Sequence, residues 1–235
     1  MKKTSLRERK FALTRLRLAK EAASRLGSQP LASLPIRDIC EQVEVSEATF
    51  FNYFPKKTDL LLYLADLWNL ECRWRMLDAK LTGLAAIEFV FAYYAKQVIK
   101  VPGAMAEMIA FQAVLREKPV ALEISPLEKR LGFPDLVGIE MVDVQSLDRL
   151  FAAQIESAVS SGELPANTHR PTIMVALASA FYGTALILGN ANPKSLAGQY
   201  VQQLHLLWDG FRLAGASGSK ANPQPQTELK SNTLI

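Results

Sequence analysis

The chain has 235 residues, 49% of them hydrophobic, and its 27 Lys and Arg outnumber its 23 Asp and Glu. This length allows two domains or one elongated domain, and the apolar content is ample for a core, which excludes a largely disordered chain. The basic N-terminal peptide is not followed by an apolar run of signal-sequence length, so we expect a cytoplasmic protein, with Cys40 and Cys72 as small reduced core residues.

The basic excess lies in the first part of the chain. Residues 1–60 hold 12 Lys and Arg against 7 Asp and Glu, whereas residues 61–235 hold 15 against 16. Such clustering is either a solvated helix face or the electrostatic footprint of a DNA-binding end. A first helix is predicted over residues 6–26, with an inner stripe of Leu16, Ala19, Ala23 and Leu26. Eight basic residues precede residue 21: Lys2, Lys3, Arg7, Arg9, Lys10, Arg15, Arg17 and Lys20.

Two short helices are predicted next, joined by a tight turn. The apolar residues of the first recur at helical spacing and are Ile36, Ile39, Cys40 and Val43. Glu44 and Val45 interrupt this helix, and the Ser46 hydroxyl is suited to cap a second helix over residues 46–54. Phe50 and Phe54 fall on one face of the second helix and are expected to pack inward. This arrangement is typical of a DNA-reading helix-turn-helix.

A long third helix is predicted directly after this pair. Pro55 ends the second short helix, and Lys56 and Lys57 precede a helix over residues 58–80. Ammonium groups beside a helix N-terminus suit contacts with phosphate. The apolar positions of the long helix are Leu60, Leu61, Leu64, Leu67 and Trp68.

Residues 35–61 resemble the N-terminal domain of the TetR family of bacterial transcriptional regulators. The family pattern runs T-V-R-D-I-A, then G-V-S-x-G-T-L-Y-x-H-F, then x-S-K-E-x-L-L, and the corresponding stretches here are PIRDIC, EVSEATFFNYF and PKKTDLL. The resemblance implies an all-α fold. It places a three-helix DNA-binding domain in residues 1–57 and a larger helical domain for ligand binding and dimerisation in residues 58–215.

The same resemblance implies that the helix over residues 46–54, capped by Ser46, enters the major groove of double-stranded DNA. The residues expected at base edges are Glu47, Ala48, Thr49 and Asn52. Glu47 is explained equally well as a solvent-facing residue favoured by the helix dipole. The residues expected to contact the DNA backbone, together with the basic arm, are Arg37, Phe51, Tyr53, Lys56 and Lys57.

Four positions depart from the family pattern. Pro35 replaces a Thr whose hydroxyl contacts a phosphate, although Pro suits a first helical turn. Glu44 replaces the Gly of the turn, where a positive φ would cost a non-glycine residue about 1 kcal/mol. Phe51 replaces a Tyr, while Tyr53 replaces a His and offers a hydroxyl from a neighbouring position. We therefore expect the DNA contacts to differ in detail from those of the family.

Gly and Pro residues divide the remainder of the chain into further helices. Two helices and a looser segment are expected between residues 81 and 140, followed by helices over residues 141–161, 170–188 and 196–214. Residues 216–235 have few large apolar side chains and are expected to be a disordered tail.

The stretch from residue 173 to residue 189 has no charged side chain. A helix that is apolar nearly all round lies in lipid or is buried against several partners. This stretch is rich in small residues, and its position matches the dimer bundle of the resembled family. We therefore expect a homodimer formed through the last two helices and no membrane insertion.

The resembled family also holds a small-molecule pocket between its C-terminal helices. Each aromatic or Met residue taken singly fits a plain core position, but as a set they suggest an apolar or aromatic effector. The candidate ligand-binding residues are Phe89, Tyr93, Met105, Met108, Phe111, Phe151 and Phe181.

No pattern in the sequence points to catalysis or to a cofactor. His169 and His205 have no carboxylate at ligand spacing, so no metal site is expected, and there is neither a Gly-rich phosphate loop nor a nucleophile elbow. The sequence predicts a ligand-responsive repressor that binds a near-palindromic operator as a homodimer and is released by a small effector. A helical enzyme and a membrane-associated interaction protein are the alternatives.

Overall fold

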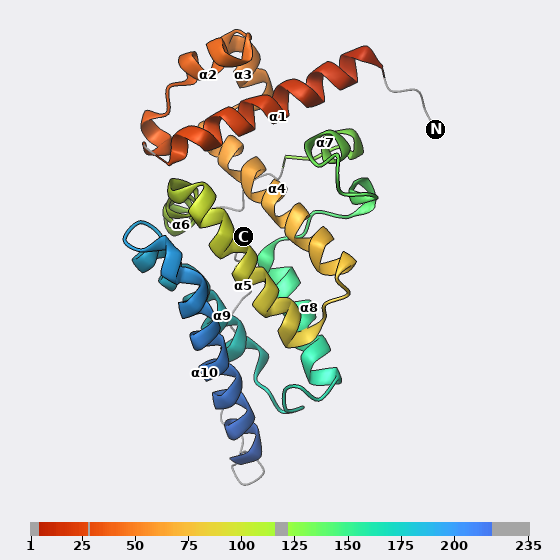
Figure 1. The fold of residues 1–235 in the computed structure, drawn as a ribbon, viewed down its shortest axis with the longest axis vertical. Helices are drawn as coiled ribbons and strands as arrows, with labels where there is room; N and C mark the ends of the chain where they lie inside the picture. The colour runs from red at the N-terminus through yellow and green to blue at the C-terminus, as the bar shows by residue number, and fades with distance from the viewer. Residues whose placement is uncertain (1–4, 28, 116–121, 218–235) are drawn as a thin grey trace. The chain divides into compact units, whose positions relative to one another are not determined.

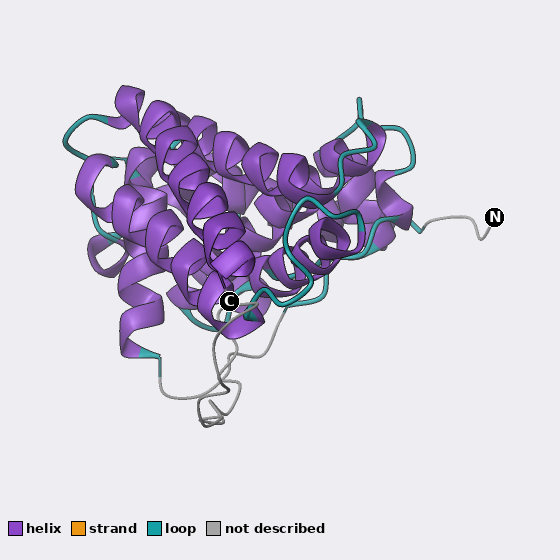
Figure 2. Cartoon of the chain, turned by 90° about the horizontal axis from the view of Figure 1, so that it is seen from below, coloured by secondary structure: helices purple, strands orange, loops and turns teal. Residues whose placement is uncertain are grey.

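The regular secondary structure in the described part of the chain is all helical. The structure, a computed structural model, describes residues 5–27, 29–115 and 122–217, and these contain ten α-helices, three 3-10 helices and no strand (Figure 1, Figure 2). The α-helices are α1 (Leu6–Leu26), α2 (Ile36–Val43), α3 (Glu47–Tyr53), α4 (Lys57–Asp78), α5 (Gly83–Lys100), α6 (Pro102–Val114), α7 (Pro126–Gly132), α8 (Leu147–Ser160), α9 (Arg170–Leu188) and α10 (Leu196–Ser217). The 3-10 helices are Leu31–Ser33, Ile139–Met141 and Pro193–Ser195. The predicted all-α fold is confirmed.

Packing divides the chain into two compact units. The first comprises Met1–Arg75 and Val98–Gln145, and the second comprises Met76–Gln97 and Ser146–Ile235. Helices α4 and α5 each continue from one unit into the other. The boundary expected at residue 57 separates a DNA-binding domain from a ligand-binding domain. Packing does not test that functional boundary, so it stays a prediction. The disordered tail was expected to begin at residue 216, but residues 216 and 217 belong to the end of α10. The rest of the expected tail, from residue 218 onward, lies outside the described residues.

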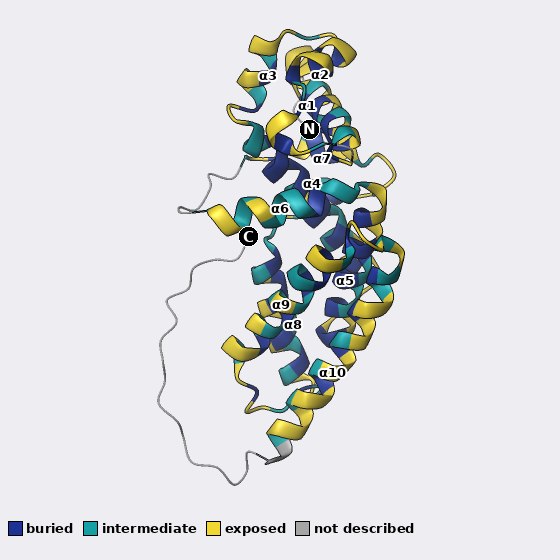
Figure 3. Ribbon diagram, turned by 90° about the vertical axis from the view of Figure 1, so that its left-hand side faces the viewer, coloured by how far each residue is buried: buried dark blue, intermediate teal, exposed yellow. Residues whose placement is uncertain are grey.

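The first unit begins with a well-capped α1. The Ser5 hydroxyl accepts a hydrogen bond from the Glu8 backbone N–H at 3.2 Å, and the Glu8 carboxylate accepts one from the Ser5 N–H at 2.7 Å. Further along the unit, Phe50 and Phe54 are fully buried, as their spacing predicted, with ring centroids 5.7 Å apart. Figure 3 shows exposed residues along the outer sides of α2 and α3, so these helices present one face to the core and one to solvent.

Two later helices of the first unit pack on α1. Helix α6 begins beside the end of α1, where a Cβ on Gly103 would overlap the carbonyl oxygen of Leu26. Helix α7 lies along α1, and a Cβ on Gly132 would stand 3.1 Å from the Leu16 side chain. Leu16, expected on the inner stripe, is only half-buried. Because glycine has no Cβ, the backbone at Gly103 can lie this close to the Leu26 carbonyl.

The second unit has an aromatic core drawn from four helices. The Phe181 ring of α9 lies 5.1 Å from the rings of Phe91 and Tyr94 of α5. It also stacks on Tyr200 of α10 at 5.9 Å and contacts Phe151 of α8 at 6.1 Å. The Tyr200 hydroxyl donates a hydrogen bond to the Phe181 carbonyl at 2.7 Å, which satisfies a buried polar group.

The structure corrects the predicted helix over residues 141–161. Only Ile139–Met141 forms a 3-10 turn, and α8 begins six residues later than expected, at Leu147. The carbonyls in between bond to other elements: Val142 accepts from Lys129 Nζ at 2.6 Å, and Asp143 accepts from Arg73 Nη1 at 2.7 Å. Hydrogen bonds to other segments thus take the place of the helical bonds that the predicted helix would have made here.

Helix α9 coincides with the uncharged stretch and is long and apolar enough to cross a membrane, with 28% of its most apolar window buried. This is weak support for a membrane span, since core helices of soluble proteins share the same length and composition.

Candidate nucleic-acid interface

The turn between α2 and α3 has the geometry that the sequence predicted. Glu44 adopts a left-handed conformation with φ 61° and ψ 47°, and the Val45 N–H donates to the Cys40 carbonyl at 2.9 Å. The Ser46 hydroxyl accepts from the Thr49 N–H at 3.1 Å and lies 2.9 Å from the Thr49 hydroxyl. The αL residue closes α2 and the serine caps α3, so the direction of α3 is fixed at its start.

The outer face of α3 is open to solvent. The predicted base-reading residues Glu47, Ala48 and Asn52 are exposed, and Thr49 is half-buried with its hydroxyl engaged by Ser46. Phe51 is 44% exposed although its edge packs on the Phe50 ring at 5.3 Å. A short helix with small and hydrogen-bonding side chains on its exposed face has the shape and chemistry that base edges require.

The first turns of α1 extend this surface. The Phe11 ring of α1 packs on the Tyr53 ring of α3 with centroids 4.6 Å apart. A groove of about 620 Å³ lies here between α1 and α3. Its lining residues are Leu6, Arg7, Lys10, Phe11, Thr49, Asn52 and Tyr53. The sequence did not single out Phe11, because the i, i+3 spacing from the inner stripe does not include it.

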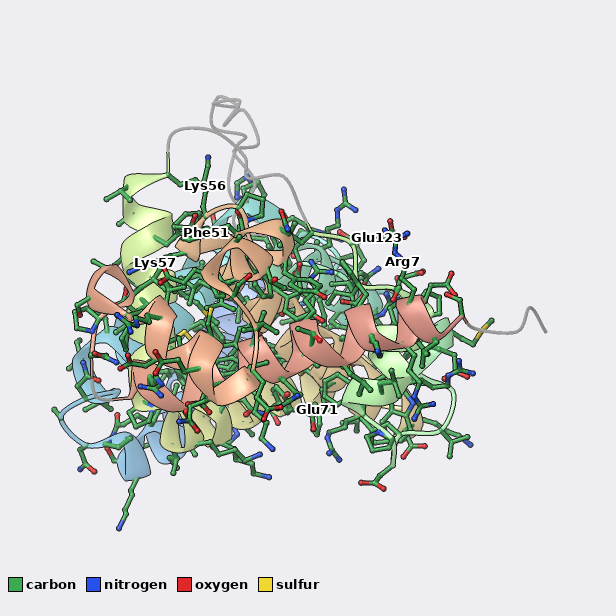
Figure 4. All side chains as sticks on the ribbon, turned by 90° about the horizontal axis from the view of Figure 1, so that it is seen from above. Arg7, Phe51, Lys56, Lys57, Glu71 and Glu123 are labelled. Carbon is green, nitrogen blue, oxygen red and sulfur yellow. The ribbon has the colours of Figure 1, made fainter. Side chains whose placement is uncertain are left out.

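Basic groups also lie at the start of α4. Figure 4 labels Lys56 and Lys57 near the exposed Phe51, and Arg7 on the first turn of α1. Lys56 has an exposed side chain, whereas Lys57 Nζ donates to the carbonyls of Ala32 and Leu34, each at 2.9 Å. Two of the three Lys57 ammonium hydrogens therefore hold the turn before α2, and one is left to meet a phosphate.

Arg37 and Arg15 differ in exposure. The Arg37 guanidinium is exposed on α2 and pairs with Glu41 one turn away at 3.0 Å. Arg15, expected among the basic arm, is 5% exposed and pairs with Glu128. The expectation that Arg15 belongs to the basic DNA-facing surface is therefore wrong. The sequence already indicated that Arg15 is buried. Arg15 stands four residues before Ala19, and residues at this spacing share one face of a helix, which here is the buried face.

Cys40 is a buried thiol on α2. Burial raises the pKa of the Cys40 thiol, and the nearby Glu47 carboxylate raises it further. Cys40 is buried and unpaired, so it is a small apolar core residue of α2 rather than a nucleophile.

The candidate ligand-binding residues are distributed over four helices. Phe89 and Tyr93 stand on α5 with ring centroids 6.5 Å apart, and Phe151 and Phe181 belong to the aromatic core of the second unit. Met105, Met108 and Phe111 stand on α6 in the first unit, with Met105 buried and the other two half-buried. Within the described residues no group of three or more His, Cys, Asp or Glu is arranged to hold a metal ion.

Comparison with known proteins agrees with this geometry. Residues 18–64 match the family model described as bacterial regulatory proteins of the tetR family. The matched residues run from the middle of α1 to the first turns of α4 and so include the whole helix-turn-helix. A search of curated proteins gives no match to the chain.

Two solved structures are similar over most of the chain. One is described as the molecular basis for control of antibiotic production by a bacterial hormone; it covers 89% of this chain and 100% of its own, with TM-score 0.59 and 16% identity. The other is FadR of Thermus thermophilus, a TetR family transcriptional repressor in complex with lauroyl-CoA; it covers 91% of this chain and 99% of its own, with TM-score 0.53 and 21% identity. The chain is therefore similar in fold to both.

Proposed function

Because this chain carries the N-terminal domain of the tetR family of bacterial regulatory proteins over residues 18–64, we propose that it is a ligand-responsive transcriptional repressor of the cytoplasm. The observation that carries the proposal is the capped helix α3, whose outer face is exposed beside basic side chains of α1 and of the start of α4. A helix of this kind fits the major groove of double-stranded DNA.

In this proposal the exposed residues of α3 read base edges. Asn52 offers a bidentate pair to adenine, Ala48 and the Thr49 methyl suit a thymine methyl, and Glu47 accepts from cytosine. Contacts to phosphate position the helix and carry no sequence information themselves. The residues assigned to the DNA backbone are Arg7, Lys10, Arg37, Phe51, Tyr53, Lys56 and Lys57.

We assign α9 and α10 to a homodimer interface. Both helices expose large apolar side chains, among them Ile187 at 72%, Leu206 at 73% and Leu213 at 69%. An exposed apolar surface on two adjacent helices favours a protein partner, and most soluble homo-oligomers are two-fold symmetric. Two copies related by such an axis would recognise a near-palindromic operator.

The effector in this proposal is a small apolar or aromatic molecule held in the C-terminal helices. Aromatic side chains there supply the apolar contacts. FadR, which is similar in fold, was solved in complex with lauroyl-CoA, whose acyl chain is apolar. Release of the operator requires that the effector bind a conformation with lower DNA affinity more tightly.

The proposal is tested by titrating duplex DNA from upstream of the gene with the purified protein at several salt concentrations. The logarithm of the affinity should fall linearly with the logarithm of salt, and Lys56→Ala should reduce that slope by about 1. Lys194→Ala, which removes an exposed charge from the second unit, serves as the control and should leave the slope unchanged. Binding that does not respond to salt would contradict DNA recognition.

A further inference from the structure

The segment between residues 123 and 143 is bonded to both α1 and α4 within the first unit. Glu128, on α7, accepts from Arg15 Nη1 of α1 and from the Tyr63 hydroxyl of α4, each at 2.9 Å. Further along, the Val137 carbonyl accepts from Trp74 Nε1 at 3.0 Å and the Asp143 carbonyl from Arg73 Nη1 at 2.7 Å. We call α1, α2, α3 and the start of α4 the reading head. The segment therefore joins α1, the first helix of the reading head, to two positions along α4 (Figure 1).

The junction at Glu128 is buried and almost fully bonded. Glu128 is 2% exposed, Arg15 5% and Tyr63 0%. The second carboxylate oxygen of Glu128 accepts from the N–H and the hydroxyl of Ser125 at 2.9 and 2.7 Å, which closes the capping box of α7. Arg15 also donates to the Glu123 carbonyl at 2.9 Å, and its guanidinium carbon lies 4.2 Å from the centre of the Tyr63 ring. Each of the three helices thus has one preferred position relative to the others.

Stability alone does not account for this junction. A buried ion pair gains little over well-packed apolar residues of similar volume, because desolvation of two charges offsets their attraction. Arg15 Nε is buried and has no acceptor among the described residues, which adds an uncompensated donor. In some proteins such a pair instead selects one arrangement, because the charges meet their partners in that geometry alone.

We propose that Glu128 is a positioning residue for operator recognition, which fixes α1 against α4 so that the reading helix keeps one orientation. The inference rests on the proposed function. It extends the reading head beyond residues 18–64 to include α7. In a dimer, the direction in which α4 leaves the head sets the separation of the two α3 helices, and the half-site spacing of the operator follows from it.

The experiment uses a duplex selected by the wild-type protein from a random-sequence library, and derivatives with one base pair added or removed at the centre. Wild type should bind the altered spacings about tenfold or more weakly, because the two heads are rigidly held. Glu128→Gln has nearly the same shape as the wild-type side chain but removes the charge and one acceptor oxygen. With its carbonyl toward Ser125 it keeps the capping box, and its NH2 group then faces Arg15 and can donate to the Tyr63 hydroxyl. Its preference for the selected spacing should fall to about threefold or less.

Two further variants complete the design. Glu123→Gln makes the same chemical change at an exposed carboxylate of the same segment and should keep the wild-type ratio. Arg15→Met combined with Glu128→Gln removes both charges and so avoids an unpaired buried ion; it should unfold in urea near the wild-type midpoint yet lose the spacing preference. A purely structural role would lower the active fraction equally for all duplexes and leave the ratio unchanged.

The outcomes separate the inference from the proposed function. If wild type selects no duplex, the proposed function fails. If wild type selects a duplex but the two Glu128 variants retain its spacing ratio, only the positioning role of Glu128 is overturned.

Discussion

Glu44 is the residue at which the backbone of the helix-turn-helix is under strain. Its φ of 61° lies in the left-handed region, where a Cβ is disfavoured and glycine is not. We expect Glu44→Gly to stabilise the protein by about 1 kcal/mol, since the turn geometry is retained while the steric cost is removed. Urea unfolding followed by circular dichroism measures the difference.

The matched control for this substitution is Gln42→Gly, two residues earlier. Gln42 is exposed within α2 and has helical backbone angles, so glycine there should cost about 1 kcal/mol through helix propensity alone. Opposite signs at the two positions would show that φ decides the effect. Destabilisation by both substitutions would contradict the strain at Glu44.

Arg15 and Lys57 show that residue type alone does not reveal the partners of a basic side chain. Both stand in a basic region of the sequence, but Arg15 is buried against Glu128 and Lys57 holds two backbone carbonyls of the turn before α2. The periodicity of α1 indicates the buried side of Arg15. No local pattern indicates that Glu128, more than a hundred residues later, supplies its partner.

At the scale of elements, the contact between α1 and α6 depends on glycine at one position. A methyl group on Gly103 would overlap the Leu26 carbonyl, so Gly103→Ala should displace the start of α6 and lower stability by about 1–3 kcal/mol. Gly27→Ala is the control, because its φ is −70° and its Cβ would stand 3.5 Å from Pro102, an ordinary contact. Thermal unfolding of both variants tests the prediction, and equal midpoints would refute it.

Helix boundaries were predictable where capping residues mark them. Helices α1 and α9 have the predicted bounds, since Ser5 and Gly27 flank the first and His169 and Gly189 flank the second. The start of α8 was not predictable from periodicity. The carbonyls of Val142 and Asp143, just upstream of α8, bond to Lys129 and Arg73, which only the tertiary structure brings near.

At the scale of the whole molecule, the exposed apolar faces of α9 and α10 predict the oligomeric state. Leu206→Arg should convert a dimer to a monomer, because a charge in the interface would lose its hydration without gaining a partner. Sedimentation velocity, at a concentration where wild type is a dimer, measures the change. Leu77→Arg, at a position of α4 that is 50% exposed, should leave the dimer intact. A wild type that requires detergent for solubility would instead favour the membrane alternative.

The sequence was least informative about which residues of the C-terminal helices bind a ligand. Phe151 and Phe181 fit a core equally well by spacing, and the structure packs both into the aromatic cluster around Phe91 and Tyr200. Spacing reports only which side of a helix a residue occupies. It does not report whether the space beside that residue is filled by protein or is available to a ligand.

The sequence by itself determined the local features of the reading head: the capped start of α3, the left-handed turn at Glu44 and the inward Phe50 and Phe54. These depend on neighbours within a few residues, and local steric and hydrogen-bonding preferences decide them. The tertiary structure alone decided that α7 joins α1 to α4 and that Arg15 is withdrawn from the surface. Those contacts unite distant segments, and their geometry follows from the packing of the whole unit rather than from any local pattern.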